Sequence, residues 1–168
     1  MPMDAQDYER WREERDRKEL ESIVEWPPPG GPFEQWIAHE LDCLVLRAPL
    51  GNLNGYVKVP PNHPDAARPY NDLVDHVDVH GGLTFGCRVK DGRWFGFDTA
   101  HAGDAVPQLI SMRDLHGLPQ GFHRLQEHTW TLAEVKAETE RLAEQLAARG
   151  GNPSCAVPPF FSKWSPSC

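Results

Sequence analysis

Residues 83–98 read LTFGCRVKDGRWFGFD and contain two strand-like apolar runs around one turn signal. Residues 83–89 and 93–98 flank Lys90-Asp91-Gly92. An Asp-Gly pair between apolar runs predicts a β-hairpin, because it supplies the positive φ that a tight turn needs. We therefore expect the two runs to pair antiparallel, and the rest of the chain to complete a sheet around them.

Two further strand-like segments precede the hairpin. Residues 43–47 and 55–59 are apolar, and the stretch between them, residues 51–54, is rich in turn-forming Gly and Asn. Prolines follow the second segment directly and prevent its continuation as an inner strand. Together with the hairpin, these segments predict an antiparallel sheet of about four strands.

Two helices are expected beside the sheet. Apolar residues recur at helical spacing in residues 33–41 and predict a short helix there. Residues 131–149 predict a longer one, because Thr131 and Glu134 match a capping box and Gly150-Gly151 is a typical helix end. Its apolar stripe should pack on one face of the sheet; the stripe consists of Leu132, Val135, Thr139, Leu142, Ala143 and Leu146.

The two ends of the chain differ in composition from this body. Residues 4–22 are dominated by charge and predict a solvated helix that docks through Tyr8 and Trp11. A Pro/Gly-rich stretch follows and is expected to act as a stiff linker. The predicted fold class is α+β, with residues 1–30 as arm and linker, 31–151 as a single domain and 152–168 as a Pro/aromatic tail.

Composition restricts the classes of function. The formal net charge is −8 and the pI about 5.4, so broad nucleic-acid binding is not expected. No run approaches the 18 apolar residues of a membrane span, and the charged N-terminus has no signal-peptide core. The four cysteines form no C-x-x-C pair; Cys43 and Cys87 are expected in the core. Reduced thiols indicate a cytoplasmic protein.

The candidate site comes from two blocks, Asp78-Val79-His80-Gly81-Gly82-Leu83-Thr84-Phe85 and residues 94–104, WFGFDTAHAGD. Each block puts His and Asp beside Gly at the end of a strand-like run. His and Asp move protons or hold metals, and Gly lets a ligand approach the backbone. Antiparallel pairing should bring both blocks to the same sheet edge. The predicted ligand-binding residues are His80, Gly81, Gly82, Thr84, Asp98, His101 and Asp104.

The residue types leave several kinds of site open. They suit a polar binding pocket without catalysis, an Asp-oriented histidine base, a site for a hard or borderline metal, or a purely structural network. The spacing assigns no catalytic residue, no metal ligand and no cofactor. His63 is expected on a surface loop. Asp72, Asp75 and Asp78 are expected as exposed loop carboxylates before His80.

Four stretches resemble a family of small, uncharacterised proteins from tailed phages, prophages and their bacterial hosts. They are residues 55–64 (GYVKVPPNHP), 77–84 (VDVHGGLT), 94–104 and 135–148. Family members often carry Cys at the position of Thr99, so a nucleophilic thiol is absent at that position here. They also often have paired aspartates where this chain has Asn71-Asp72. The resemblance implies a phage or prophage accessory protein in the cytoplasm of a bacterial host.

The leading expectation for function is binding of a small polar, nucleotide-derived ligand at the His80/Asp98/His101 region, serving to sequester a host signalling molecule. A second expectation is a small hydrolase that uses the same residues, with or without a divalent metal. A third is an acidic protein–protein inhibitor, whose protein partner would be bound through the N-terminal arm or the C-terminal tail.

Overall fold

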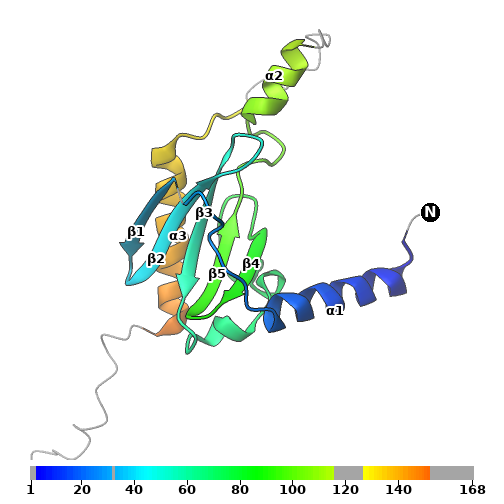
Figure 1. Cartoon of the computed structure of the whole chain (residues 1–168), viewed down its shortest axis with the longest axis vertical. Coiled ribbons are helices and arrows are strands. Elements are labelled where there is room, and N and C mark those ends of the chain that lie inside the picture. Colours follow the sequence, from blue (N-terminus) through cyan, green and yellow to red (C-terminus); the bar gives the residue numbers. More distant parts are fainter. Residues whose placement is uncertain (1–2, 32, 116–126, 152–168) are drawn as a thin grey trace, which may run out of the picture.

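The computed structural model describes residues 3–31, 33–115 and 127–151. Five strands form one antiparallel sheet in the order β1-β2-β3-β5-β4 (Figure 1). The strands are β1 (Glu34–Ala38), β2 (Leu41–Arg47), β3 (Leu53–Val59), β4 (Phe85–Val89) and β5 (Gly92–Phe97). The helices are α1 (Ala5–Glu21), α2 (Pro107–Leu115) and α3 (Leu132–Gly150), with short 3-10 helices η1 (Pro64–Ala67) and η2 (Tyr70–Leu73). The α+β fold class is confirmed.

The predicted hairpin is formed by β4 and β5. The strands pair antiparallel, with Val89 opposite Gly92 and Phe85 opposite Gly96. Gly92 has a φ of 155° in the turn. Strand β5 is buried along its whole length because both faces of the sheet are covered. Strand β5 therefore belongs to the core, whereas β4 forms the edge of the sheet and is only partly buried.

The short helix expected over residues 33–41 is wrong: this segment forms strand β1, and the sheet has five strands. Trp36 and Ala38 alternate with exposed neighbours and pack against the core, while Ile37 is 72% exposed. His39 and Glu40 take positive φ values of 51° and 64° in the turn to β2. The spacing of the apolar residues fits a helix as well as a strand. The strand forms because pairing with β2 gives its backbone groups hydrogen-bond partners.

Helix α3 packs across one face of the sheet, as predicted (Figure 1). Thr131 and Glu134 form the expected capping box. Five side chains of the helix are fully buried against sheet residues such as Val57 and Phe95, and they all belong to the predicted stripe. They are Val135, Thr139, Leu142, Ala143 and Leu146.

The segment predicted as a linker contributes to the opposite face of the sheet. The Trp26 ring lies 4.6 Å from Tyr56, 5.1 Å from Phe85 and 5.1 Å from Trp94, measured between ring centroids. Val24 donates a backbone hydrogen bond to the carbonyl of Arg88. The Pro-rich segment is therefore held on the sheet by Trp26.

Helix α1 extends away from the sheet and contacts it with its C-terminal end (Figure 1). The expected docking through Tyr8 and Trp11 is wrong, since these side chains remain 50% and 48% exposed. Instead, Glu19 forms an ion pair with the fully buried Arg93 and accepts a hydrogen bond from the backbone N–H of Tyr70. An ion pair at Glu19 therefore holds the arm on the sheet, and the pattern of apolar residues in the arm does not point to Glu19.

Within the described ranges, no helix combines the length and the apolar character required to cross a membrane. Cys43 is buried and Cys87 partly buried, both as free thiols. Burial raises the pKa of each thiol to about 12, so both stay protonated. The predicted tail over residues 152–168, with Cys155 and Cys168, lies outside the described residues.

Candidate functional site

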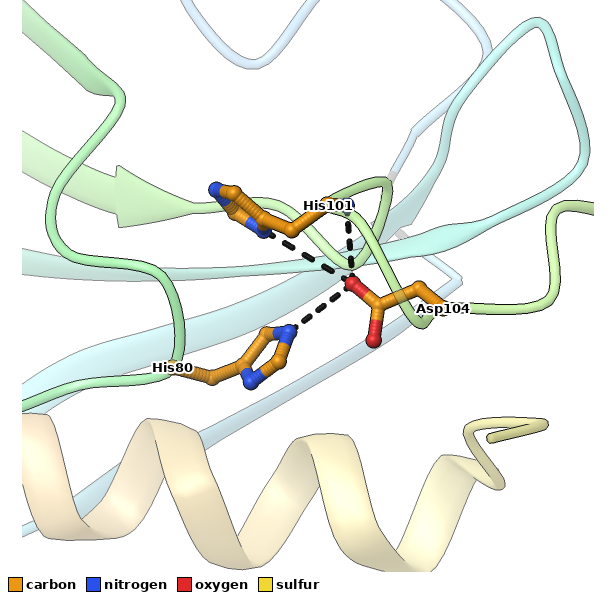
Figure 2. Close-up of side chains that lie close together, drawn as sticks. All are labelled: His80, His101 and Asp104. Atoms are coloured by element: carbon orange, nitrogen blue, oxygen red, sulfur yellow. Dashed lines mark hydrogen bonds and ion pairs between the residues drawn. The ribbon is translucent and has the colours of Figure 1, made fainter. Parts of the chain in front are cut away.

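The two loops that carry the predicted site residues meet at one edge of the sheet. His80 precedes β4, and His101 and Asp104 follow β5. Since β4 and β5 are antiparallel neighbours, the entry to one strand lies beside the exit from the other. Figure 2 shows the three side chains directed toward one another.

Asp104 is the centre of this cluster. Its side chain is 4% exposed, and its Oδ2 lies 2.8 Å from His80 Nε2. The same oxygen accepts from the backbone N–H of His101 at 2.8 Å, and Oδ1 accepts from Trp130 Nε1 at 2.8 Å. Burial alone would raise the pKa of Asp104, but the hydrogen bonds from His80, Trp130 and His101 outweigh it and lower the pKa. Asp104 is therefore an ionised, fully engaged carboxylate at neutral pH.

His80 is held from both sides. Its backbone N–H donates to Glu138 Oε1 at 2.6 Å, and its ring lies 4.6 Å from the Trp130 ring. Because an ionised carboxylate can only accept, His80 Nε2 carries the hydrogen that faces Asp104. In a neutral imidazole, Nδ1 is then the nitrogen without a hydrogen, and the side chain is 28% exposed. This is the arrangement of an imidazole base oriented by a buried aspartate.

His101 depends on Gly81 for its position. Gly81 has a φ of 67°, and a Cβ built there would lie 2.2 Å from the His101 ring. The space expected for a ligand at Gly81 is thus filled by the imidazole. The His80 and His101 rings lie edge to face, with centroids 5.2 Å apart.

The buried ring nitrogen of His101, Nδ1, has no hydrogen-bond partner. Nδ1 is buried and lies 3.4 Å from Asp98 Oδ1 and 3.7 Å from Asp104 Oδ2, in neither case with hydrogen-bond geometry. Asp98 Oδ1 instead accepts from the backbone N–H of Ala100. The cluster therefore contains a buried nitrogen, flanked by two carboxylates, that makes no hydrogen bond.

Two predicted residues lie outside the cluster. Thr84 is exposed, and its backbone N–H extends the hairpin by donating to the carbonyl of Gly96. Gly82 forms a turn with Val79, and a Cβ there would approach only Val74. The structure thus brings together His80, Asp98, His101 and Asp104, with Gly81 as the residue that makes room.

Two participants escaped prediction, Trp130 and Glu138. Trp130 immediately precedes the N-cap of α3, and Glu138 lies on its first turns. Glu138 is also paired with Arg141, and this pairing and the His80 N–H outweigh its burial and lower its pKa. Neither residue belongs to a recognisable sequence motif. Both come close to the site only because α3 packs on the sheet.

The expectation for His63 is wrong, because it is a structural residue and not a surface one. It is 8% exposed, its Nε2 lies 2.8 Å from the carbonyl oxygen of Leu146, and its Nδ1 accepts from the backbone N–H of Asp65. Thr99 is also buried, and its hydroxyl donates to the carbonyl of Leu53. Asp72, Asp75 and Asp78 are exposed as expected.

A groove of about 330 Å³ lies next to the cluster and is lined in part by Trp130, the hydrogen-bond donor to Asp104. Ala105, the neighbour of Asp104, also lines it. Phe33 and Arg47 also line it, with the Arg47 guanidinium 5.1 Å from the centre of the Phe33 ring. The groove therefore offers an aromatic surface and a positive charge beside the cluster.

No protein-family model, curated protein or solved structure matches this chain. The chemistry of the site is therefore inferred from its own geometry. Two partly exposed imidazoles around one buried carboxylate can bind the polar groups of a ligand, move a proton, or coordinate a cation.

Proposed function

We propose that this protein binds a small polar, nucleotide-derived ligand at the His80–His101–Asp104 cluster and in the adjoining groove. The observation that carries the proposal is the pair of imidazoles held by the buried Asp104, each 28–29% exposed, next to a groove. Such a combination of a few fixed polar groups and a partly apolar cavity is typical of small-molecule sites.

The groove supports a nucleotide-derived ligand through its lining. Its volume is at the lower end of the range of small-ligand pockets. Phe33 presents a ring on which a base can stack, and Arg47 presents a guanidinium suited to a phosphate. The net charge of −8 disfavours binding of a long polyanion such as a nucleic acid, but it does not prevent binding of one phosphorylated small molecule in a local pocket.

The biological role we propose is that of a phage or prophage accessory protein that sequesters a host nucleotide signal. The resemblance in residues 55–64, 77–84 and 94–104 supports this role. A sequestering protein needs a site that binds its ligand without converting it.

The proposal is tested on freshly purified full-length protein. Mass spectrometry of the supernatant after heat denaturation should detect a released small molecule. Thermal shift with adenosine monophosphate and with a cyclic dinucleotide should then raise Tm for a bound probe. Arg47→Ala and His101→Ala should abolish the shift, whereas His76→Ala, at an exposed histidine, should keep it. No released molecule and no shift with either probe would refute the proposal.

A second candidate function is hydrolysis of the same class of molecule, and the His80–Asp104 pair favours it. His80 Nδ1 is the free nitrogen of an Asp-oriented imidazole and would take a proton from an attacking water. Incubation of the nucleotide probes with the protein, followed by phosphate and product analysis, tests this. Turnover that falls at least about 100-fold in His80→Ala would support the hydrolase, and intact probes after prolonged incubation would exclude it for those molecules.

A further inference from the structure

We propose that His80, His101 and Asp104 bind one divalent first-row transition metal ion, with Zn²⁺ as the best fit. The inference rests on the cluster used in the proposed function, and it is independent of which organic ligand the groove takes. It assigns His80 Nε2, His101 Nδ1 and Asp104 Oδ2 as the three ligand atoms.

The spacing of these atoms is close to that of a metal site. Each of the three residues offers one ligand atom, and the atoms lie within 4.8 Å of one another. Two separations from Asp104 Oδ2 are 2.8 Å, to His80 Nε2, and 3.7 Å, to His101 Nδ1. Ligands about 2.0–2.2 Å from a tetrahedral zinc lie roughly 3.3–3.5 Å apart. The two separations from Asp104 Oδ2 differ from this spacing by less than about 1 Å, and the two imidazole nitrogens, at most 4.8 Å apart, would have to approach each other by up to about 1.5 Å to seat the ion.

The unused nitrogen of His101 is the second observation that points to a cation. Nδ1 is buried, has no hydrogen-bond partner and faces the oxygens of Asp98 and Asp104. A buried polar atom in a native protein normally has a partner. A metal ion between Nδ1 and Asp104 would supply that partner.

The surroundings already hold the ligands in place. Trp130 Nε1 and the His101 backbone N–H orient the Asp104 carboxylate, and Gly81 leaves room for the His101 ring. Partners of this kind fix ligand orientation in metal sites. On metal binding at Nε2, His80 takes the tautomer with its hydrogen on Nδ1.

Charge also favours a divalent cation. Asp98 and Asp104 bring two carboxylates to the cluster. Among the ion pairs of residues 3–31, 33–112 and 127–151, neither of them contacts Lys or Arg. With both imidazoles neutral, a divalent ion would balance the two negative charges.

Two imidazoles and one carboxylate suit Zn²⁺ better than Ca²⁺ or Mg²⁺, which prefer all-oxygen sites. Three protein ligands leave a fourth position open, and both histidine side chains are about 29% exposed. Such an open position accepts water or a polar group of a ligand.

The test uses full-length protein that has been treated with chelator and dialysed. Calorimetric titration with Zn²⁺ should show one ion per chain, and Co²⁺ should produce the visible absorption of a tetrahedral site. His101→Ala and Asp104→Asn should each weaken Zn²⁺ binding at least tenfold and remove the Co²⁺ spectrum. His76→Ala should bind as the wild type does. His101→Ala is the decisive variant, because the His101 Nδ1 has no hydrogen bond to lose.

Absence of saturable Zn²⁺ binding, or its retention in the His80→Ala/His101→Ala double variant with native circular dichroism, would overturn the inference. The two proposals fail separately. Zinc binding without any nucleotide shift would leave the metal site standing alone. A nucleotide shift with no Zn²⁺ binding, unaffected by chelator, would support the proposed function and reject the metal.

Discussion

At the scale of single residues, Asp104 determines the state of the site. Its carboxylate accepts from His80, His101 and Trp130 while being almost wholly buried. Hydrogen bonds to the charged form lower a carboxyl pKa, and here they outweigh burial. The unfolded chain then binds more protons than the folded chain as the pH falls toward 3.8, the ordinary pKa of Asp.

Asp104→Asn should therefore destabilise the protein most at neutral pH. The stabilisation from Asp104 is present above its unfolded pKa and is lost as the pH falls through its lower folded pKa. We expect the difference in unfolding free energy between wild type and variant to shrink between pH 5 and pH 2, measured by urea denaturation as a function of pH. Asp75→Asn, at an exposed carboxylate, serves as control. A difference that stays constant over this range would contradict the assignment.

Gly81 and Gly82 provide a matched pair for testing the His101 position. Both have positive φ, 67° and 79°, so Ala at either position carries a similar backbone penalty of about 1–2 kcal/mol. Only at Gly81 would the new Cβ collide with the His101 ring, since at Gly82 it would lie 3.4 Å from Val74. Gly81→Ala should therefore destabilise more than Gly82→Ala and displace the His101 imidazole signals in NMR spectra. Equal effects would show that the ring does not lie over Gly81.

At the scale of elements, α3 links the core to the site. Its capping box sets where the helix begins, and its buried stripe orients it on the sheet. Trp130 before its N-cap and Glu138 on its next turns then reach Asp104 and His80. A change in the packing of α3 should consequently disturb the site as well as the stability.

Leu142→Ala tests this coupling. Leu142 is fully buried, so the variant should lose about 2–5 kcal/mol of unfolding free energy through lost apolar contact and a cavity. Leu109→Ala on α2 removes the same atoms from a side chain that is 47% exposed, and should change the free energy much less. Denaturant midpoints measure both. An unchanged midpoint for Leu142→Ala would mean that α3 does not belong to the core.

At the scale of the whole molecule, the N-terminal arm belongs to the folded body. Glu19 pairs with Arg93, which is fully buried in β5, and Trp26 packs on the aromatic face of the sheet. The arm has few apolar residues, which predicts that the body still folds without residues 1–25. The Glu19–Arg93 pair adds that this truncated chain should be less stable, because the Arg93 guanidinium would stay buried without its carboxylate.

Glu19→Ala should destabilise the protein by about 3–5 kcal/mol, since an uncompensated buried charge is left behind. Glu21→Ala should have almost no effect, because its pairing with Arg17 joins two exposed side chains. Replacing both partners, as in Glu19→Leu/Arg93→Met, should restore most of the loss. Thermal and urea unfolding of the full chain measure all three. A Glu19→Ala variant as stable as Glu21→Ala would show that the arm is not docked by this pair.

The sequence by itself determined the elements that are marked by residues close together in the chain. Asp91-Gly92 predicts the β4–β5 hairpin, and the capping box with the period of apolar residues predicts α3. The same hairpin places His80 beside Asp98 and His101, because antiparallel neighbours share an edge. These features depend on residues that are close in sequence or related by a single turn.

Only the tertiary structure decided the features that depend on distant partners. Residues 33–41 carry an apolar pattern that fits a helix and a strand, and pairing with β2 selects the strand. Glu19 and Arg93 are 74 positions apart, His80 and Glu138 are 58, and no local pattern links them. Such contacts form when packing excludes water from both partners and leaves each polar group only the other to bind.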